Sequence, residues 1–174
     1  SECSPTISTN GQTGNRPGSV GKVLANMEVR FVDGEIQVKG SNVMKGYYQM
    51  PKETEEAFSD GWLRTGDLGR IDEDGYLYIT GRLKNLIILS NGENVSPEEI
   101  ENFMLTHDLV GEIVISGEEN GLGARIYPDP DVVEAKGLSP EDVAAQLQGI
   151  LDDYNKTQPL YRAITTLKVR KYPF

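Results

Sequence analysis

Residues 62–101 read WLRTGDLGRIDEDGYLYITGRLKNLIILSNGENVSPEEIE, and the structural pattern changes within this stretch. Two runs of β-forming residues, Leu68–Ile71 and Tyr76–Arg82, flank the turn residues Asp72–Gly75, which predicts an antiparallel hairpin. From residue 85 onward a short apolar strand, Leu86–Leu89, is followed by helix-forming residues. The stretch therefore predicts a junction between a β-rich part, up to about residue 82, and a part that mixes strands with helices.

The β-rich part extends toward the N-terminus as a second hairpin. Met27–Val32 alternates apolar and polar residues, which is the pattern of a half-buried strand. Glu35–Lys39 predicts its partner, with Ile36 and Val38 on one side. The Asp33-Gly34 pair between them tolerates the positive φ that a two-residue hairpin turn needs. Three aromatic residues near these strands are expected to pack between strands and helix rather than to contact a ligand: Tyr47, Tyr48 and Trp62.

The part that follows residue 85 has two helix starts. Ser96-Pro97-Glu98-Glu99 has the form of a capping box, in which Ser96 caps the helix and Glu99 reaches back to it. This helix is expected over Pro97–Thr106, with Ile100, Phe103 and Met104 facing inward. A second helix begins at Ser139 in the same way. The remaining expected elements are a short acidic helix at Pro51–Phe58 and strands at Leu109–Ser116, Gly123–Tyr127 and Ile164–Val169.

The composition narrows the classes of protein to which the chain can belong. It has 174 residues, with 17 Lys and Arg against 27 Asp and Glu, so its net charge is −10. This balance argues against nucleic-acid binding, which needs a basic surface, and against docking on anionic lipid by charge alone. The single cysteine, Cys3, cannot form an internal disulfide, which fits a reducing compartment such as the cytoplasm. Leu86–Leu89, the longest apolar run, is far too short to cross a bilayer.

Three polar segments could carry chemistry, and each also has an ordinary structural explanation. Asp67 follows a glycine in Arg64–Leu68, where a carboxylate suits a vicinal diol such as a ribose, but a turn in which Asp67 caps nearby amides is the simpler interpretation. Gly81–Lys84 offers paired cations that could hold a polar ligand or form a solvated basic tip. Asn91-Gly92 needs a tight turn before the helix, and structure alone would explain it. A single Cys and a single His cannot build a zinc site, and the G-x-x-x-x-G-K-[ST] phosphate loop is absent.

Taken together and in this order, the three segments closely resemble the AMP-forming acyl-CoA synthetase family, which also contains adenylation domains and luciferases. T-G-D, G-R-x-K and a closing E-I-E all fall within residues 62–101. Gly40–Tyr48 resembles the segment that precedes T-G-D in the family, and Ser1–Pro5 resembles the end of its Y-G-x-[ST]-E motif. The motif N-G-E-N-V-x-P-E-E-I-E is most similar to that of bacterial long-chain fatty-acid CoA ligases.

The resemblance implies an α+β fold in two parts. Residues 1–83 would form the β-rich end of the large adenylate-forming domain, residue 84 the hinge, and residues 85–174 a small, mobile α+β C-terminal domain. The family's phosphate loop and C-terminal catalytic lysine have no match in the chain, which opens on Ser1 without Met and stops at Phe174. We therefore expect a truncated C-terminal fragment that is inactive on its own.

The resemblance also implies the site residues, motif by motif. Glu2 would bind the Mg²⁺ of ATP, and Ser1 would face the phosphate. Asp67 would accept hydrogen bonds from both ribose hydroxyls, and Arg82 would approach the same ribose. Glu2 and Lys84, the latter at the hinge, are the expected catalytic residues. The turn that is expected to line the coenzyme A channel comprises Ser90, Asn91 and Gly92.

The reaction implied by the family has two steps. Its members activate a carboxylate with ATP as an acyl-adenylate and then transfer the acyl group to coenzyme A. The expected parent protein is thus a fatty-acid CoA ligase whose substrates are a fatty acid, ATP and coenzyme A. The motif N-G-E-N-V-x-P-E-E-I-E favours a long-chain fatty acid. Peripheral membrane contact of the parent stays open, because long-chain substrates partition into lipid. Two alternatives also stay open: an adenylation domain of a peptide synthetase, and a non-catalytic interaction protein with the adenylate-forming fold.

Overall fold

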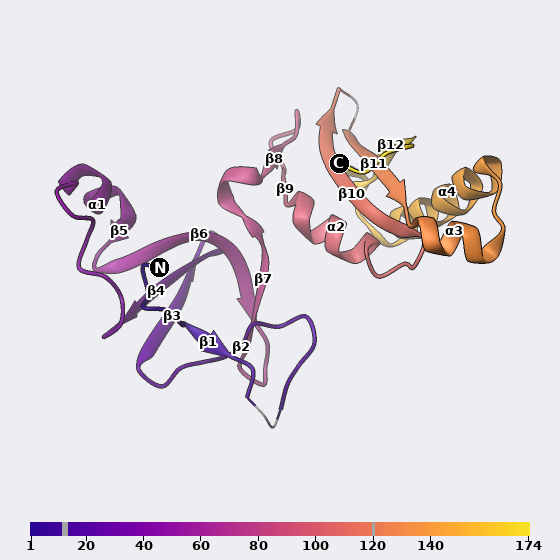
Figure 1. Cartoon of the computed structure of the whole chain (residues 1–174). Coiled ribbons are helices and arrows are strands. Elements are labelled where there is room, and N and C mark those ends of the chain that lie inside the picture. Colours follow the sequence, from indigo (N-terminus) through magenta and orange to yellow (C-terminus); the bar gives the residue numbers. More distant parts are fainter. Residues whose placement is uncertain (12–13, 120) are drawn as a thin grey trace. The chain divides into compact units, whose positions relative to one another are not determined.

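The computed structural model describes residues 1–11, 14–119 and 121–174 (Figure 1). The chain forms two compact units, Ser1–Lys84 and Asn85–Phe174. Each unit buries its own cluster of apolar side chains. The first unit is dominated by a sheet and the second mixes helices with strands, so the fold belongs to the α+β class.

The first unit is built on an antiparallel sheet. The sheet order is β1-β2-β7-β6-β4-β3, and β5 pairs with β6. Its buried side chains come from alternate positions of the central strands, including Val38 and Leu63. The elements of this unit are β1 (Ser8–Thr9), β2 (Gly21–Val23), β3 (Met27–Val32), β4 (Glu35–Gly40), the helix α1 (Pro51–Ala57), β5 (Phe58–Ser59), β6 (Trp62–Ile71) and β7 (Tyr76–Arg82).

Both predicted hairpins form, and one of their strands is longer than predicted. Asp33 and Gly34 join β3 to β4 with φ of 50° and 81°, the left-handed conformations that a two-residue turn requires. Strand β6 begins at Trp62 rather than near Leu68. The T-G-D residues therefore lie inside a strand, because Leu63 and Arg64 already pair with β4. The prediction of a loop at T-G-D was wrong in this respect.

The second unit contains a three-stranded sheet and a separate short ribbon. The sheet order is β10-β11-β12, with β10 antiparallel and β12 parallel to β11. The parallel return of β12 is possible because α3 and α4 supply the connection (Figure 1). The 3-10 turn η1 (Leu83–Asn85) falls at the boundary between the two units in the sequence. The elements of the second unit are β8 (Ile87–Ile88), β9 (Asn94–Val95), α2 (Pro97–Met104), β10 (Val110–Glu118), β11 (Gly121–Pro128), α3 (Pro130–Lys136), α4 (Pro140–Thr157), the 3-10 turn η2 (Leu160–Arg162) and β12 (Ile164–Val169).

The helix starts match the sequence pattern at one position and depart from it at another. At α4 the Ser139 hydroxyl accepts the Asp142 amide, and the Asp142 carboxylate accepts the Ser139 amide, which completes the capping box. At α2 the Ser96 side chain makes no cap; its hydroxyl donates instead to Glu98. Glu99, expected to close that box, binds Arg162 at 2.8 Å. The predicted capping box therefore does not form, because Ser96 binds Glu98 and Glu99 binds Arg162.

Candidate functional site

Strand β6 bulges outward at the T-G-D residues. Arg64 pairs with Gln37 and Leu68 pairs with Glu35, so three residues of β6 lie opposite the single residue Ile36 of β4. Gly66, at the centre of the bulge, has φ of 70°, which glycine adopts without strain. Bulges of this kind change the direction in which a strand presents its side chains, and here the side chain that follows the glycine is Asp67.

The backbone of the bulge is held by two side chains. The Thr65 hydroxyl donates to the Ile36 carbonyl at 2.7 Å and accepts the Asp67 amide at 3.1 Å. The Glu35 carboxylate accepts the Gly66 amide at 3.1 Å. Amides that leave a sheet need partners elsewhere, and these two side chains provide them. The conformation of the T-G-D segment is therefore specified by hydrogen bonds as well as by the glycine.

Asp67 and Arg82 face each other across β6 and β7. They are directly paired in the strand register, and Arg82 Nε lies 2.9 Å from Asp67 Oδ1. Asp67 is 24% exposed and Arg82 54% exposed, so the ion pair borders solvent. A carboxylate has about four lone-pair positions, so Asp67 can accept hydroxyl groups while it stays paired with Arg82. Such a carboxylate is well suited to a diol.

Four of the expected site residues line one cavity of the first unit. This cavity of about 330 Å³ is bordered by Ser1, Glu2, Asp67 and Arg82, which come from distant parts of the sequence. Tyr47 also lines it and donates its hydroxyl to Glu2 Oε1 at 3.3 Å. The expectation that Tyr47 only packs between elements was therefore wrong. Tyr48 departs further from it, because its side chain is 87% exposed.

The Glu2 carboxylate is ionised and fits one kind of metal ion. Its own backbone amide and the Ser1 amino group donate to it, which holds the pKa of Glu2 below its ordinary value. Mg²⁺ in nucleotide enzymes is usually bound by one or two carboxylates together with substrate phosphates. Glu2 borders the cavity and supplies one such carboxylate, so its chemistry fits that ion.

Lys84 does not line the cavity that holds Glu2. It borders another cavity of the first unit, of about 560 Å³, together with Glu35, Glu56 and Arg64. Arg82 is the expected site residue that borders both cavities. The two residues expected to be catalytic, Glu2 and Lys84, therefore border different cavities of this unit.

The expected coenzyme A turn borders a cavity of the second unit. Ser90 and Asn91 line a cavity of about 530 Å³, together with the exposed apolar side chains of Ile88 and Leu160. The turn is closed by the Gly92 amide, which donates to the Leu89 carbonyl at 2.9 Å. Gly92 has φ of 84° and serves the turn rather than the cavity wall.

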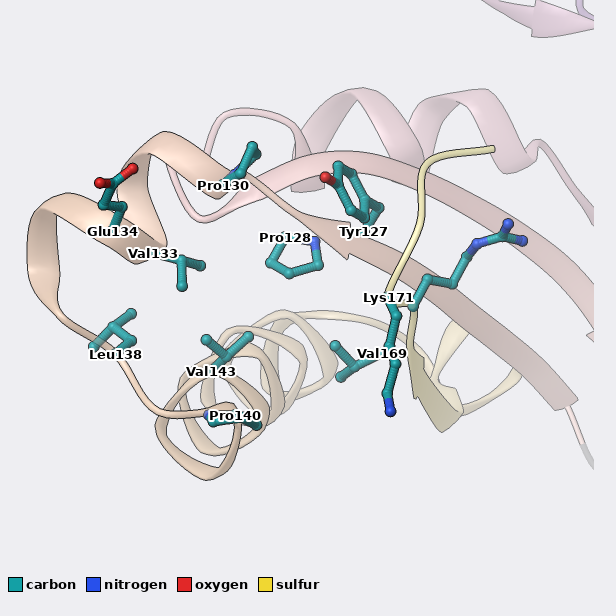
Figure 2. Close-up of a pocket in the computed structure, with 11 residues that line it drawn as sticks. Tyr127, Pro128, Pro130, Val133, Glu134, Leu138, Pro140, Val143, Val169 and Lys171 are labelled. Carbon is teal, nitrogen blue, oxygen red and sulfur yellow. The ribbon is translucent and has the colours of Figure 1, made fainter.

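An apolar cavity of about 600 Å³ also lies in the second unit. Val133 from α3, Val143 from α4 and Val169 from β12 point toward one another across it (Figure 2). Its other walls include Pro128 and Leu138, with Lys171 beside β12. Glu134, Arg170 and Lys171 also line this cavity, but none of the motif residues does. The cavity at Asp67 is the stronger candidate site.

The α+β fold of the chain is that of the C-terminal part of adenylate-forming enzymes. A family model described as the AMP-binding enzyme C-terminal domain matches residues 84–172. The chain belongs to this family, the AMP-forming acyl-CoA synthetases.

Two CoA ligases and one solved structure show which enzymes the chain is similar to. The chain is 43% identical over 119 residues to the long-chain-fatty-acid–CoA ligase FadD15 of Mycobacterium tuberculosis, covering 67% of this chain and 20% of that protein. It is 41% identical over 138 residues to the 2-succinylbenzoate–CoA ligase of Bacillus velezensis, covering 74% and 28%. Among solved structures, O-succinylbenzoate coenzyme A synthetase (MenE) from Bacillus subtilis in complex with AMP shares 32% identity with a TM-score of 0.72, covering 98% of this chain and 36% of that one.

These relatives confirm the predicted family and the α+β fold. They do not distinguish between a long-chain fatty acid and another carboxylic acid as the substrate. The chain spans between about a fifth and about a third of the length of the relatives that it matches. Ligases named for a long-chain fatty acid and for 2-succinylbenzoate are about equally similar to it. Within the described residues, no helix is both long and apolar enough to span a bilayer.

Proposed function

We propose that the chain is the C-terminal portion of an ATP-dependent, AMP-forming acyl-CoA ligase. The observation that carries this proposal is the single cavity bordered by Ser1, Glu2, Asp67 and Arg82. These residues were selected from separate motifs, and a purely structural origin for each motif gives no reason for them to converge. A relative bound to AMP has the same fold over nearly the whole chain, which supports a nucleotide as the ligand.

In this proposal the nucleotide is held by its ribose and its phosphates. Asp67 accepts hydrogen bonds from the ribose hydroxyls, and the ion pair with Arg82 orients the carboxylate. The Ser1 hydroxyl faces the phosphates. Mg²⁺, held by Glu2, would neutralise phosphate charge while the carboxylate substrate attacks, and the Tyr47 hydroxyl orients Glu2.

The second unit serves the transfer step. Residue 84 is the hinge, and residues 85–174 form the mobile domain that changes its face between the two half-reactions. The turn at Ser90, Asn91 and Gly92 lines the passage for coenzyme A, for which the 530 Å³ cavity offers polar and apolar walls together. The chain alone is expected not to catalyse the full reaction, because the phosphate loop and the catalytic lysine of the family have no match in it.

A long-chain fatty acid is the favoured substrate of the parent enzyme, which we place in the cytoplasm. The motif N-G-E-N-V-S-P-E-E-I-E and the FadD15 relative support this choice. An aromatic acid such as 2-succinylbenzoate is the second candidate, because relatives that act on it by name are equally similar.

The test is ATP–pyrophosphate exchange by the complete protein that contains this chain. The panel comprises fatty acids of graded length, 2-succinylbenzoate and the proteinogenic amino acids. Exchange stimulated by long fatty acids is expected. Exchange with 2-succinylbenzoate alone would keep the ligase and replace the substrate, whereas exchange with amino acids alone would indicate a peptide-synthetase domain. No exchange from a folded protein would contradict the proposed activity and favour the non-catalytic alternative.

A further inference from the structure

Glu35 is a buried carboxylate that none of the sequence motifs includes. It begins β4 and is 4% exposed, next to Gln37, which is 3% exposed. Carboxylates are almost never this deeply buried without several partners, because removal from water penalises the charge. Glu35 does not line the cavity that contains Asp67; it borders the cavity that Gly66 and Lys84 line.

The contacts of Glu35 account for its burial. Its Oε1 accepts the Gly66 amide at 3.1 Å. Its Oε2 accepts Gln37 Nε2 at 3.0 Å and Arg64 Nε at 3.2 Å. One carboxylate therefore joins the backbone of the bulge to a side chain of β4 and a side chain of β6.

A second layer of contacts holds this arrangement in place. Arg30 donates twice to Gln37 Oε1, at 2.9 and 2.7 Å, and once to the Ser59 carbonyl at 3.2 Å. Its guanidinium also stacks 4.8 Å from the centre of the Trp62 ring. Gln37 can thus present only its amide hydrogens to Glu35, which fixes the carboxylate beneath Gly66.

Glu35 is charged despite its burial. Burial by itself would raise the pKa of Glu35, but the hydrogen bonds from Gln37, Arg64 and the Gly66 amide outweigh it, so the pKa lies below the ordinary value. Hydrogen bonds to an ionised acceptor are about twice as strong as neutral ones. The bond from Gly66 to Glu35 is therefore a firm anchor.

We propose that Glu35 is a positioning residue, which holds the Gly66 amide so that Asp67 is presented to the nucleotide ribose in register with Arg82. The inference rests on the proposed function for its ligand, but its structural part concerns the free chain alone. Gly66 immediately precedes Asp67, and its φ of 70° together with its hydrogen bond to Glu35 sets the course of the chain at that point. Loss of the anchor lets the bulge relax and moves the carboxylate away from Arg82.

The first test is a pair of matched variants of the whole chain. Glu35→Gln keeps the shape of the side chain but turns one acceptor into a donor that faces Gln37 and Arg64. Glu28→Gln makes the same change at an exposed position of the neighbouring strand β3. We expect hydrogen exchange of the Gly66 amide, measured by NMR, to become about tenfold faster in Glu35→Gln alone. The Nε–H signal of Arg82 is expected to shift in the same variant.

The second test measures AMP affinity by titration of the same proteins. Glu35→Gln is expected to bind AMP about tenfold more weakly than the wild type, and Glu28→Gln within about twofold. Unchanged Gly66 exchange in Glu35→Gln would overturn the inference, and so would altered exchange with unchanged AMP affinity. If the wild type binds no AMP, the proposed nucleotide site fails, while the Gly66 and Arg82 signals still decide whether Glu35 positions Asp67.

A third variant separates positioning from general destabilisation. Combining Glu35→Gln with Gln37→Glu places the carboxylate next to Arg30. The amide introduced at position 35 can then donate to that carboxylate, while its carbonyl accepts the Gly66 amide. We expect this double variant to recover most of the Gly66 protection and AMP affinity lost in the single variant. A double variant as weak as the single one, with the sheet intact, would contradict the proposed geometry.

Discussion

Gly66 is the residue on which the shape of the T-G-D bulge most directly depends. Its φ is 70°, and a Cβ at this position would meet nothing within 4 Å. The cost of Gly66→Ala is therefore backbone strain, about 1–2 kcal/mol of unfolding free energy. Gly61, in the turn between β5 and β6, has φ of 78° and equally open surroundings, so it provides a matched control.

The two glycine variants should agree in stability and differ in binding. Gly66→Ala and Gly61→Ala are expected to lower the unfolding free energy by similar amounts, measured by urea denaturation. Gly66→Ala alone should weaken AMP binding, by about tenfold, because Asp67 follows the strained residue. Equal AMP affinity in the two variants would show that the bulge does not orient the binding carboxylate.

Some residues of the candidate site could be predicted from the sequence, and others could not. The resemblance identified Asp67 and Arg82, and the structure brings both to one cavity, although their roles stay predictions. Glu35 was not identifiable, because the alternation in β4 assigns Ile36 and Val38 to the core and Glu35 and Gln37 to the surface. All four are buried. Long arginine side chains on neighbouring strands supply the partners that make burial of the polar pair possible.

At the scale of elements, a half-buried acid, Glu101, attaches α2 to the edge strand β10. The Glu101 carboxylate accepts the Ile115 amide at 2.8 Å. Burial raises the pKa of Glu101, the Ile115 hydrogen bond lowers it by less, and nearby Glu98 adds to the rise. A carboxyl whose folded pKa is raised stabilises the fold below its unfolded pKa, and this stability is lost as the pH rises through the folded pKa.

Because the folded state disfavours the charged form of Glu101, a substitution that removes this charge should stabilise the fold. Glu101→Gln keeps an oxygen that can accept the Ile115 amide and removes the half-buried charge. We expect a higher melting temperature than the wild type near pH 7, and little difference at about pH 4, where Glu101 is protonated. Glu119→Gln, an exposed acid of the same unit, should show no such pH dependence. A lower melting temperature near pH 7 would mean that the charge itself is required.

Helix positions were predictable from the sequence, but some of their details were not. The pattern located α2 and α4 and their prolines, and α4 buries Val143, Leu147 and Leu151 as expected. Phe103 was expected inside, but it is 47% exposed and contacts the rings of His107 and Tyr154 at the surface. The helix α3 was not predicted, although Asp129 caps it and Gly137 ends it with φ of 60°. Its seven residues are too short for helical periodicity to be visible.

At the scale of the whole molecule, the chain has two cores with separate tasks. The sheet unit supports the cavity at Asp67, and the α+β unit carries the Ser90–Gly92 turn and the match to the AMP-binding enzyme C-terminal domain. The family could be predicted because its motifs use turn glycines and charged residues at fixed spacing. The acyl group could not, because ligases named for a long-chain fatty acid and for 2-succinylbenzoate match the chain about equally well.

The central claim is that Asp67 binds the ribose hydroxyls of an adenine nucleotide. An isotope-labelled sample of the chain should be titrated with AMP and with the dideoxy analogue that lacks both hydroxyls, while the NMR signals of Gly66, Asp67 and Arg82 are followed. We expect AMP to shift these signals and the analogue to bind about tenfold more weakly, with the difference abolished in Asp67→Asn. Equal binding of AMP and the analogue, or shifts confined to residues away from Asp67, would contradict the account.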